Sequence, residues 1–168
     1  MNTVYATFTA SASRYPDNDF LHIPAQACKH YADASITLAY RETAEQVEAL
    51  KATYAALGYG PGHRVALMLE NRAEFFLHWF ALNGLGCSVV PINHEMAAEE
   101  QAYIINHSEA GLLLLLPDLA PVLKALQPLL ENQPACVTTG QLEQLPAPAS
   151  PAGDEQPGLA SECALLYT

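Results

Sequence analysis

Three glycines, at Gly58, Gly60 and Gly62, have the spacing of a loop that could bind phosphate. A dinucleotide-binding glycine loop follows a strand and opens a helix, so that the helix N-terminus faces the pyrophosphate. Here the expected order is helix, glycines, strand. We therefore interpret the glycines as a structural turn.

His94 and Glu95 begin like the helix of a zinc protease, but position 98 is alanine and supplies no second histidine. The remaining histidines have no mutual spacing typical of metal ligands: His22, His30, His63, His78 and His107. A lone histidine is more often a surface residue or a satisfied core residue. We predict no metal site, and no Ser or Cys can be placed beside a His to form a nucleophilic triad.

The four cysteines, Cys28, Cys87, Cys136 and Cys163, are widely separated and form no CxxC pair. This pattern does not resemble the disulfide framework of a small secreted domain or a zinc site. We interpret them as buried or idle thiols in a reducing cytosol.

Composition limits the class of protein. The 168 residues are 51% hydrophobic and 15% charged, which favours one folded unit. The net charge of −11, from 7 basic and 18 acidic residues, argues against a nucleic acid partner. The N-terminus has no signal-peptide pattern, and the apolar run Leu112–Leu116 is far shorter than the about 20 residues of a membrane span. A cytoplasmic location without a membrane span is expected.

Short apolar runs bounded by turn residues predict strands buried on both faces of a sheet. Such buried strands are expected at 64–69 and 88–92, further strands at 112–116 and 135–139, and a shorter extended piece at 20–23. Helical periodicity predicts helices at 4–14, 39–57, 71–86, 97–107 and 119–130, the third capped by Asn71 with Glu74. This alternation predicts an α/β fold with a mainly parallel sheet flanked by helices.

The expected helix at 71–86 contains the aromatic residues Phe75, Phe76, Trp79 and Phe80. They could line an apolar pocket, but we favour packing of the helix on the sheet. The chain divides into an α/β subdomain at 1–144, a Pro/Ala-rich loop at 145–160, and the start of a further strand at 161–168 that the terminus cuts off.

Residues 36 to 116 resemble the N-terminal domain of the adenylate-forming enzymes, which include acyl-CoA synthetases, luciferases and peptide-synthetase adenylation domains. Five segments carry the resemblance in the family's order: Leu38–Glu42, Leu57–Ala66, Leu69–Phe75, Gly84–Asn93 and Ala164–Thr168. The last is similar to the strand that leads into the family's phosphate loop. Departures from the family pattern at Ala39, His63 and Cys87 fall on positions that we interpret as structural.

The resemblance implies ligation of a carboxylic acid in two steps, through an acyl-adenylate formed from ATP with Mg²⁺ and then a thioester with coenzyme A. It places Thr168, and less strongly Tyr167, at the nucleotide phosphates, and Asn93, His94 and Glu95 on the coenzyme A side. No catalytic residue is assigned within the chain, because most of the family's site would follow Thr168. We expect the first part of the large N-terminal domain of an acyl-CoA synthetase, inactive alone.

Two other functions stay open. One is a stand-alone, non-catalytic α/β binding or interaction module that uses the same scaffold. The other is an amino-acid-activating adenylation domain, which differs in an acyl pocket expected downstream. A homo-oligomer is also allowed, and the sequence does not define the acyl group.

Overall fold

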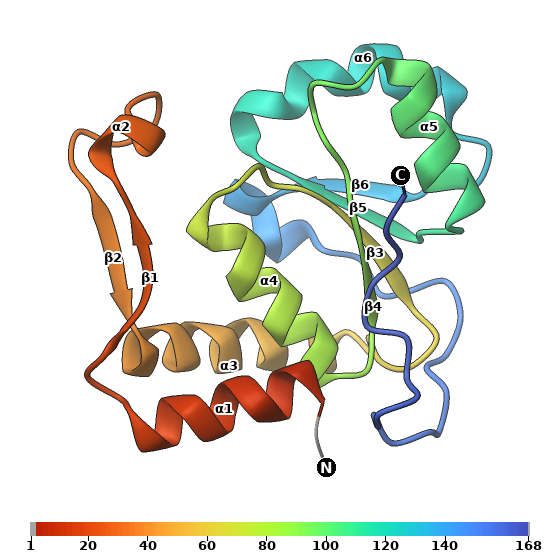
Figure 1. Cartoon of the computed structure of the whole chain (residues 1–168). Coiled ribbons are helices and arrows are strands. Elements are labelled where there is room, and N and C mark those ends of the chain that lie inside the picture. Colours follow the sequence, from red (N-terminus) through yellow and green to blue (C-terminus); the bar gives the residue numbers. More distant parts are fainter. Residues whose placement is uncertain (1–2, 168) are drawn as a thin grey trace.

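A parallel sheet of four strands lies at the centre of the computed structural model, which describes residues 3–167 (Figure 1). The strands are β3 (Arg64–Met68), β4 (Ser88–Pro91), β5 (Leu112–Leu115) and β6 (Ala135–Thr138), in the spatial order β4-β3-β5-β6. All three pairings are parallel. The predicted α/β fold and its four strands are confirmed, with β3, β4 and β5 mostly buried and β6 only partly so.

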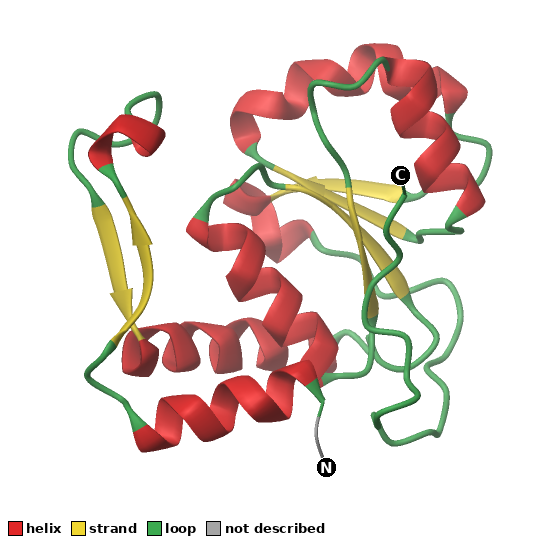
Figure 2. Cartoon of the chain, in the orientation of Figure 1, coloured by secondary structure: helices red, strands yellow, loops and turns green. Residues whose placement is uncertain are grey.

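Helices cover both faces of this sheet (Figure 2). One face packs against α1 (Val4–Arg14), α3 (Tyr40–Ala56) and α4 (Ala73–Gly84), and the other against α5 (Ala98–His107) and α6 (Leu123–Leu126). Along β3, Val65 and Leu67 belong to the first core, whereas Ala66 and Met68 belong to the second. Because side chains alternate across a strand, a sheet covered on both faces requires the nearly continuous apolar runs of the sequence.

An antiparallel ribbon stands beside α3 and α4 and is formed by β1 (Asp19–Ile23) and β2 (Ile36–Ala39). The short helix α2 (Ala25–Cys28) lies at the end of this ribbon. Phe20 of β1 packs edge-on against Tyr40 and Phe76, with ring centroids 5.2 and 6.2 Å away. These aromatic contacts fasten the ribbon to the helices.

Of the four clustered aromatic residues of α4, Phe80 is the most buried and stacks on Phe8 of α1, with centroids 4.4 Å apart. This is the core packing that the sequence favours. Phe75, by contrast, lines a cleft described below.

The helix predicted over 119–130 is wrong as one continuous helix. The segment consists of a 3₁₀ helix at Pro117–Val122, the single turn α6, and a second 3₁₀ stretch at Gln127–Leu129. Pro121 and Pro128 explain the breaks, since proline lacks the backbone N–H and its ring clashes with the preceding turn. A last 3₁₀ segment, Thr139–Gln144, follows β6.

Asn71 does not cap α4. The helix begins at Ala73 with Arg72 at the N-cap, and no described side chain caps it. At α3 and α5, the first-turn residues Glu42 and Glu100 accept from the N-cap amides of Ala39 and Ala97, at 3.4 and 3.1 Å. This is half of a capping box, because alanine offers no side-chain acceptor in return.

The strand predicted to start within 161–168 is reduced, in the residues that the structure describes, to one parallel bridge between Ala164 and Val89 of β4. The amide of Val89 donates to the Cys163 carbonyl at 3.2 Å, and the amide of Leu165 donates to the Val89 carbonyl at 2.9 Å. The chain then approaches the end of α5, where the Tyr167 hydroxyl lies 2.8 Å from His107 Nδ1. Thr168 lies outside the described residues.

Residues 145–160, which we call the strap, fold back along the glycine turn at 58–62. The hydroxyl of Tyr59 donates to the Pro146 carbonyl at 3.1 Å, His63 Nε2 lies 2.9 Å from the Ser150 carbonyl, and the Gly153 amide donates to the Pro61 carbonyl at 2.8 Å. Gly58 and Gly62 have φ values of +90° and +88°, which glycine adopts without strain. The structural interpretation of the glycines is confirmed.

Candidate functional site

A cleft of about 740 Å³ opens at the carboxyl ends of the central strands. The chain leaves β3 toward α4 on one face of the sheet, whereas it leaves β4 and β5 toward the opposite face. In open α/β sheets, ligands bind where neighbouring loops diverge in this way. The walls include Tyr31, Glu70, Arg72, Phe75, Asn93, His94 and Glu95.

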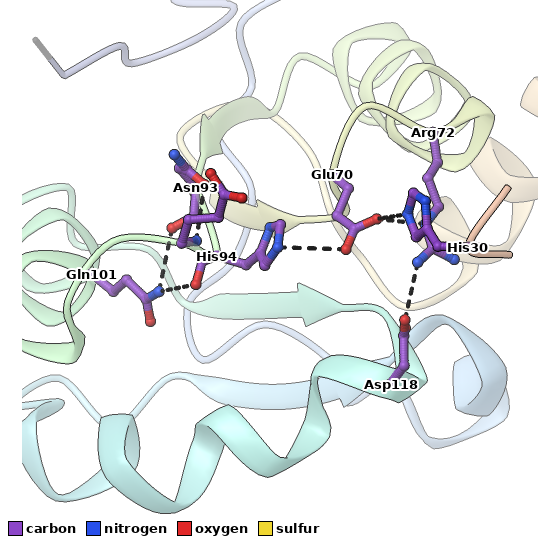
Figure 3. A network of polar contacts seen from close by, with 8 residues as sticks. His30, Glu70, Arg72, Asn93, His94, Gln101 and Asp118 are labelled. Carbon is purple, nitrogen blue, oxygen red and sulfur yellow. Dashed lines mark hydrogen bonds and ion pairs between the residues drawn. The ribbon is translucent and has the colours of Figure 1, made fainter. Parts of the chain in front are cut away.

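Glu70, in the loop after β3, lies at the centre of the polar contacts in this cleft (Figure 3). Arg72 donates from Nε to Glu70 Oε2 at 2.8 Å, and His30 Nε2 lies 3.3 Å from the same oxygen. His94 Nε2 lies 3.6 Å from Oε1. One carboxylate therefore connects the segment after α2, the loop after β3 and the loop after β4.

Arg72 extends the network to a fourth segment. Its Nη2 donates to Asp118 Oδ2, in the segment after β5, at 3.0 Å, and its guanidinium lies 4.2 Å from the centre of the Tyr31 ring. The side chain of Arg72 is only 9% exposed. A planar guanidinium suits this position because it can pair with two carboxylates and stack on a ring at once.

The pKa values of both central groups are shifted toward the charged forms. Burial alone would raise the pKa of Glu70, but hydrogen bonds from Arg72 and His30 and the nearby positive charge outweigh it and lower that pKa. Burial likewise opposes the charge on Arg72, but Glu70 and Asp118 raise its pKa. The network is therefore an ion-paired cluster at neutral pH.

The backbone at Glu70 has a φ of +54°, in the left-handed region that costs a non-glycine residue about 1 kcal/mol. The side chain is nonetheless only 15% exposed, and its ion pairs with His30, Arg72 and His94 lie within the cleft network. The network offsets the local backbone cost.

The loop after β4, residues 93–96, forms another wall. Asn93 Oδ1 accepts from the amide of Glu95 at 2.9 Å, which closes a local turn. Behind the loop, Gln101 of α5 donates from Nε2 to the carbonyls of Asn93, His94 and Met96. The backbone of this wall is thus held from inside the protein.

The predicted site residues separate into two groups. Asn93, His94 and Glu95 lie together in the cleft, whereas Tyr167 contacts His107 and does not line it. Thr168 is not among the described residues. Sequence reasoning missed three residues of the cleft wall, His30, Glu70 and Arg72, and two that contact the wall from outside the cleft, Gln101 and Asp118. Glu70 and Asp118 each follow a buried strand, and this position could have indicated that their side chains lie at the carboxyl edge of the sheet.

The cleft does not fit a triphosphate. Among the lining residues, Glu70 and Glu95 outnumber the one permanent cation, Arg72, and Arg72 already pairs with Glu70 and with Asp118 beyond the lining. Among residues 3–167, no group of three acidic, His or Cys side chains is arranged to hold a metal ion. In the same residues, no helix is long and apolar enough to cross a membrane.

Comparison with known sequences gives a family. The model of the AMP-binding enzyme family matches residues 8–168. A crotonobetaine/carnitine–CoA ligase of Proteus mirabilis is 35% identical over 99 residues, which are 59% of this chain and 18% of that ligase. The Escherichia coli ligase of the same name is 31% identical over 106 residues, or 63% and 20% of the two chains.

Solved structures agree on the fold. A fatty acyl CoA synthetase of Mycobacterium tuberculosis superposes with a TM-score of 0.76 at 21% identity, over 98% of this chain and 32% of that one. A long-chain-fatty-acid CoA ligase of Rhodopseudomonas palustris, described as putative, gives 0.72 at 18% identity, over 95% and 40%. The matched region spans about a fifth of the length of the curated relatives. With the family model matching nearly every residue, the chain belongs to the AMP-binding enzyme family.

Proposed function

We propose that this chain is the N-terminal part of an ATP-dependent, AMP-forming acyl-CoA synthetase and that it is inactive alone. The observation that carries the proposal is the family match over residues 8–168, joined to relatives named as CoA ligases. The proposed substrates of the whole enzyme are a carboxylic acid, ATP and coenzyme A.

The proposed reaction has two displacements. A carboxylate oxygen attacks the α-phosphorus of ATP, the bond to the β-phosphate oxygen breaks, and pyrophosphate leaves with the electron pair. The sulfur of the thiol, having lost its proton, then attacks the acyl carbon, and AMP leaves. Both steps develop charge on phosphate oxygens, which cationic and hydrogen-bonding groups must stabilise. Because the described cleft is acidic, we place that part of the site outside this cleft.

Two sets of residues receive proposed roles. Asn93, His94 and Glu95 line the cleft where the uncharged, thiol-bearing arm of coenzyme A would pass, since Glu95 and Glu70 would repel its phosphates. Tyr167 and Thr168 lead to the nucleotide phosphates. The direction of residues 163–165, parallel to β4, supports this role because their continuation runs toward the carboxyl edge of the sheet.

The test is carboxylate-dependent exchange of labelled pyrophosphate into ATP, combined with the intact mass of the native protein in its source cell. We expect a native mass well above the 18.1 kDa of this chain, exchange by the native protein, and none by the isolated chain. A native mass of 18.1 kDa, together with no pyrophosphate exchange, would contradict the ligase proposal and favour the non-catalytic binding module.

A further inference from the structure

Gln101 is a buried amide with a specific set of partners. Its side chain is 1% exposed, and Nε2 lies 3.3, 3.0 and 3.0 Å from the carbonyl oxygens of Asn93, His94 and Met96. All three partners are acceptors, so only the amide nitrogen can face them, and its orientation is determined by chemistry. The two N–H groups of this amide thus donate to three carbonyl oxygens of one loop.

The other end of this amide carries a cost. No donor among residues 3–167 reaches Gln101 Oε1, although the oxygen is buried. Leaving a buried polar atom without a partner is unfavourable. An apolar side chain of similar length would avoid that cost but would leave the three loop carbonyls without their donor.

The contacts of residues 93–96 show that the Gln101 amide holds this loop against α5. Its carbonyls turn inward to Gln101, while the His94 side chain extends toward Glu70 in the cleft (Figure 3). Asn93 is occupied within the loop by the amide of Glu95, so it does not fix the loop to the rest of the protein. Gln101 therefore provides the main polar attachment of this wall to α5.

We propose that Gln101 is a positioning residue that sets the backbone of residues 93–96 for the thiol acceptor. The proposal rests on the proposed function for the identity of that acceptor. It does not require Gln101 to touch a substrate, because the side chain acts through the carbonyls of the loop.

The experiment compares Gln101→Met and Gln101→Glu with Ser108→Ala. Met keeps the length of the side chain and removes the donor. Glu can donate only when protonated, so its effect should grow as pH rises. Ser108 is the matched control because it is also 1% exposed, at the other end of α5, and its hydroxyl donates to the Ile105 carbonyl at 3.1 Å.

Two readouts are measured. In this chain, hydrogen exchange of the Glu95 and Met96 amides reports the order of the loop, because both donate to Asn93. We expect exchange about tenfold faster in Gln101→Met and unchanged in Ser108→Ala. In the ligase that contains the chain, we expect a KM for the thiol raised about tenfold, with pyrophosphate exchange unchanged.

Equal acceleration in Gln101→Met and Ser108→Ala would overturn the proposal, because it would indicate general loosening of α5. Faster exchange of the loop amides in Gln101→Met with an unchanged KM for the thiol would also overturn it. An equal loss of rate in pyrophosphate exchange and in thioester formation would do the same. If Gln101→Met does not fold, the pH dependence of Gln101→Glu decides in its place. Absence of pyrophosphate exchange in the native protein would contradict the proposed function. The amide exchange rates would still show whether Gln101 anchors the loop.

Discussion

Arg72 joins two loops of the sheet by pairing with Asp118 through Nη2 at 3.0 Å while its Nε holds Glu70 at 2.8 Å. The two partners differ in environment. The Glu70 side chain is 15% exposed and that of Asp118 is 60% exposed. Solvent screens the outer pair much more than the inner one.

Replacement of Arg72 by Met should therefore lower the free energy of unfolding by about 3 kcal/mol, because it leaves a buried carboxylate without its main partner. Asp118→Asn should cost less than about 1 kcal/mol, since that pair is exposed on one side. Urea unfolding of both variants measures the difference. Equal losses in the two variants would show that the inner pair is not the stronger one.

His78 should make stability depend on pH. It is 3% exposed, its Nδ1 lies 2.9 Å from the Tyr54 hydroxyl, and burial lowers its pKa from 6.5 to about 4. Between these values the unfolded chain binds a proton that the folded chain does not, so stability falls as pH falls. The contribution over the whole window is about 3 kcal/mol.

The measurement is urea unfolding from pH 7 to pH 4 for the parent and for His78→Gln, whose amide keeps both a donor and an acceptor for Tyr54. The parent should lose more stability than the variant over that range. His22→Gln, at an exposed position of β1, is the control. A parent and a His78→Gln variant with the same pH dependence would mean that His78 is not buried as described.

Gly60→Ala should release the strap. A Cβ at Gly60 would lie 2.8 Å from the Cβ of Ala152, closer than such atoms approach, so the strap must shift. Glu-C protease should then cleave after Glu155 faster than in the parent. Gly111→Ala is the control, because a Cβ there has no described atom within 4 Å. Unchanged cleavage in Gly60→Ala would indicate that the strap adapts without detaching.

The four thiols should react in an order set by burial. None forms a disulfide in the described chain; Cys163 is exposed, Cys136 is half-buried, and Cys28 and Cys87 are buried. Burial raises the pKa of Cys87 to about 12, so almost no thiolate is available at neutral pH. Titration with a chromogenic disulfide should give one fast thiol, and Cys163→Ser should remove it. Fast reaction of Cys87 in the folded protein would contradict the core packing.

The sequence predicted those elements whose pattern is local. The strands at Arg64–Met68 and Leu112–Leu115 were evident because burial on both faces requires continuous apolar runs. The helix predicted over 119–130 failed because its apolar spacing was given more weight than Pro121 and Pro128. Local pattern predicts burial better than it predicts where a helix is interrupted.

The candidate site was only partly predictable. Asn93, His94 and Glu95 could be proposed because the segment Gly84–Asn93 resembles a segment of the adenylate-forming enzymes. The network at Glu70 brings together His30, Arg72 and Asp118 from separate loops, and their meeting depends on strand order. Nothing in the spacing of one sequence reveals that order, although polar residues directly after buried strands mark the edge where such groups meet.

The bridge between Val89 and Ala164 has a consequence for folding during synthesis. β4 is the outer strand of the sheet, and its partner on that side comes from the last residues of the described chain. As the ribosome makes the chain from its N-terminus, the sheet can assemble while the outer N–H and C=O of Val89 still lack this partner. During that interval the nascent protein exposes a strand edge to other unfinished chains, a template for aggregation that closes only when Ala164 arrives.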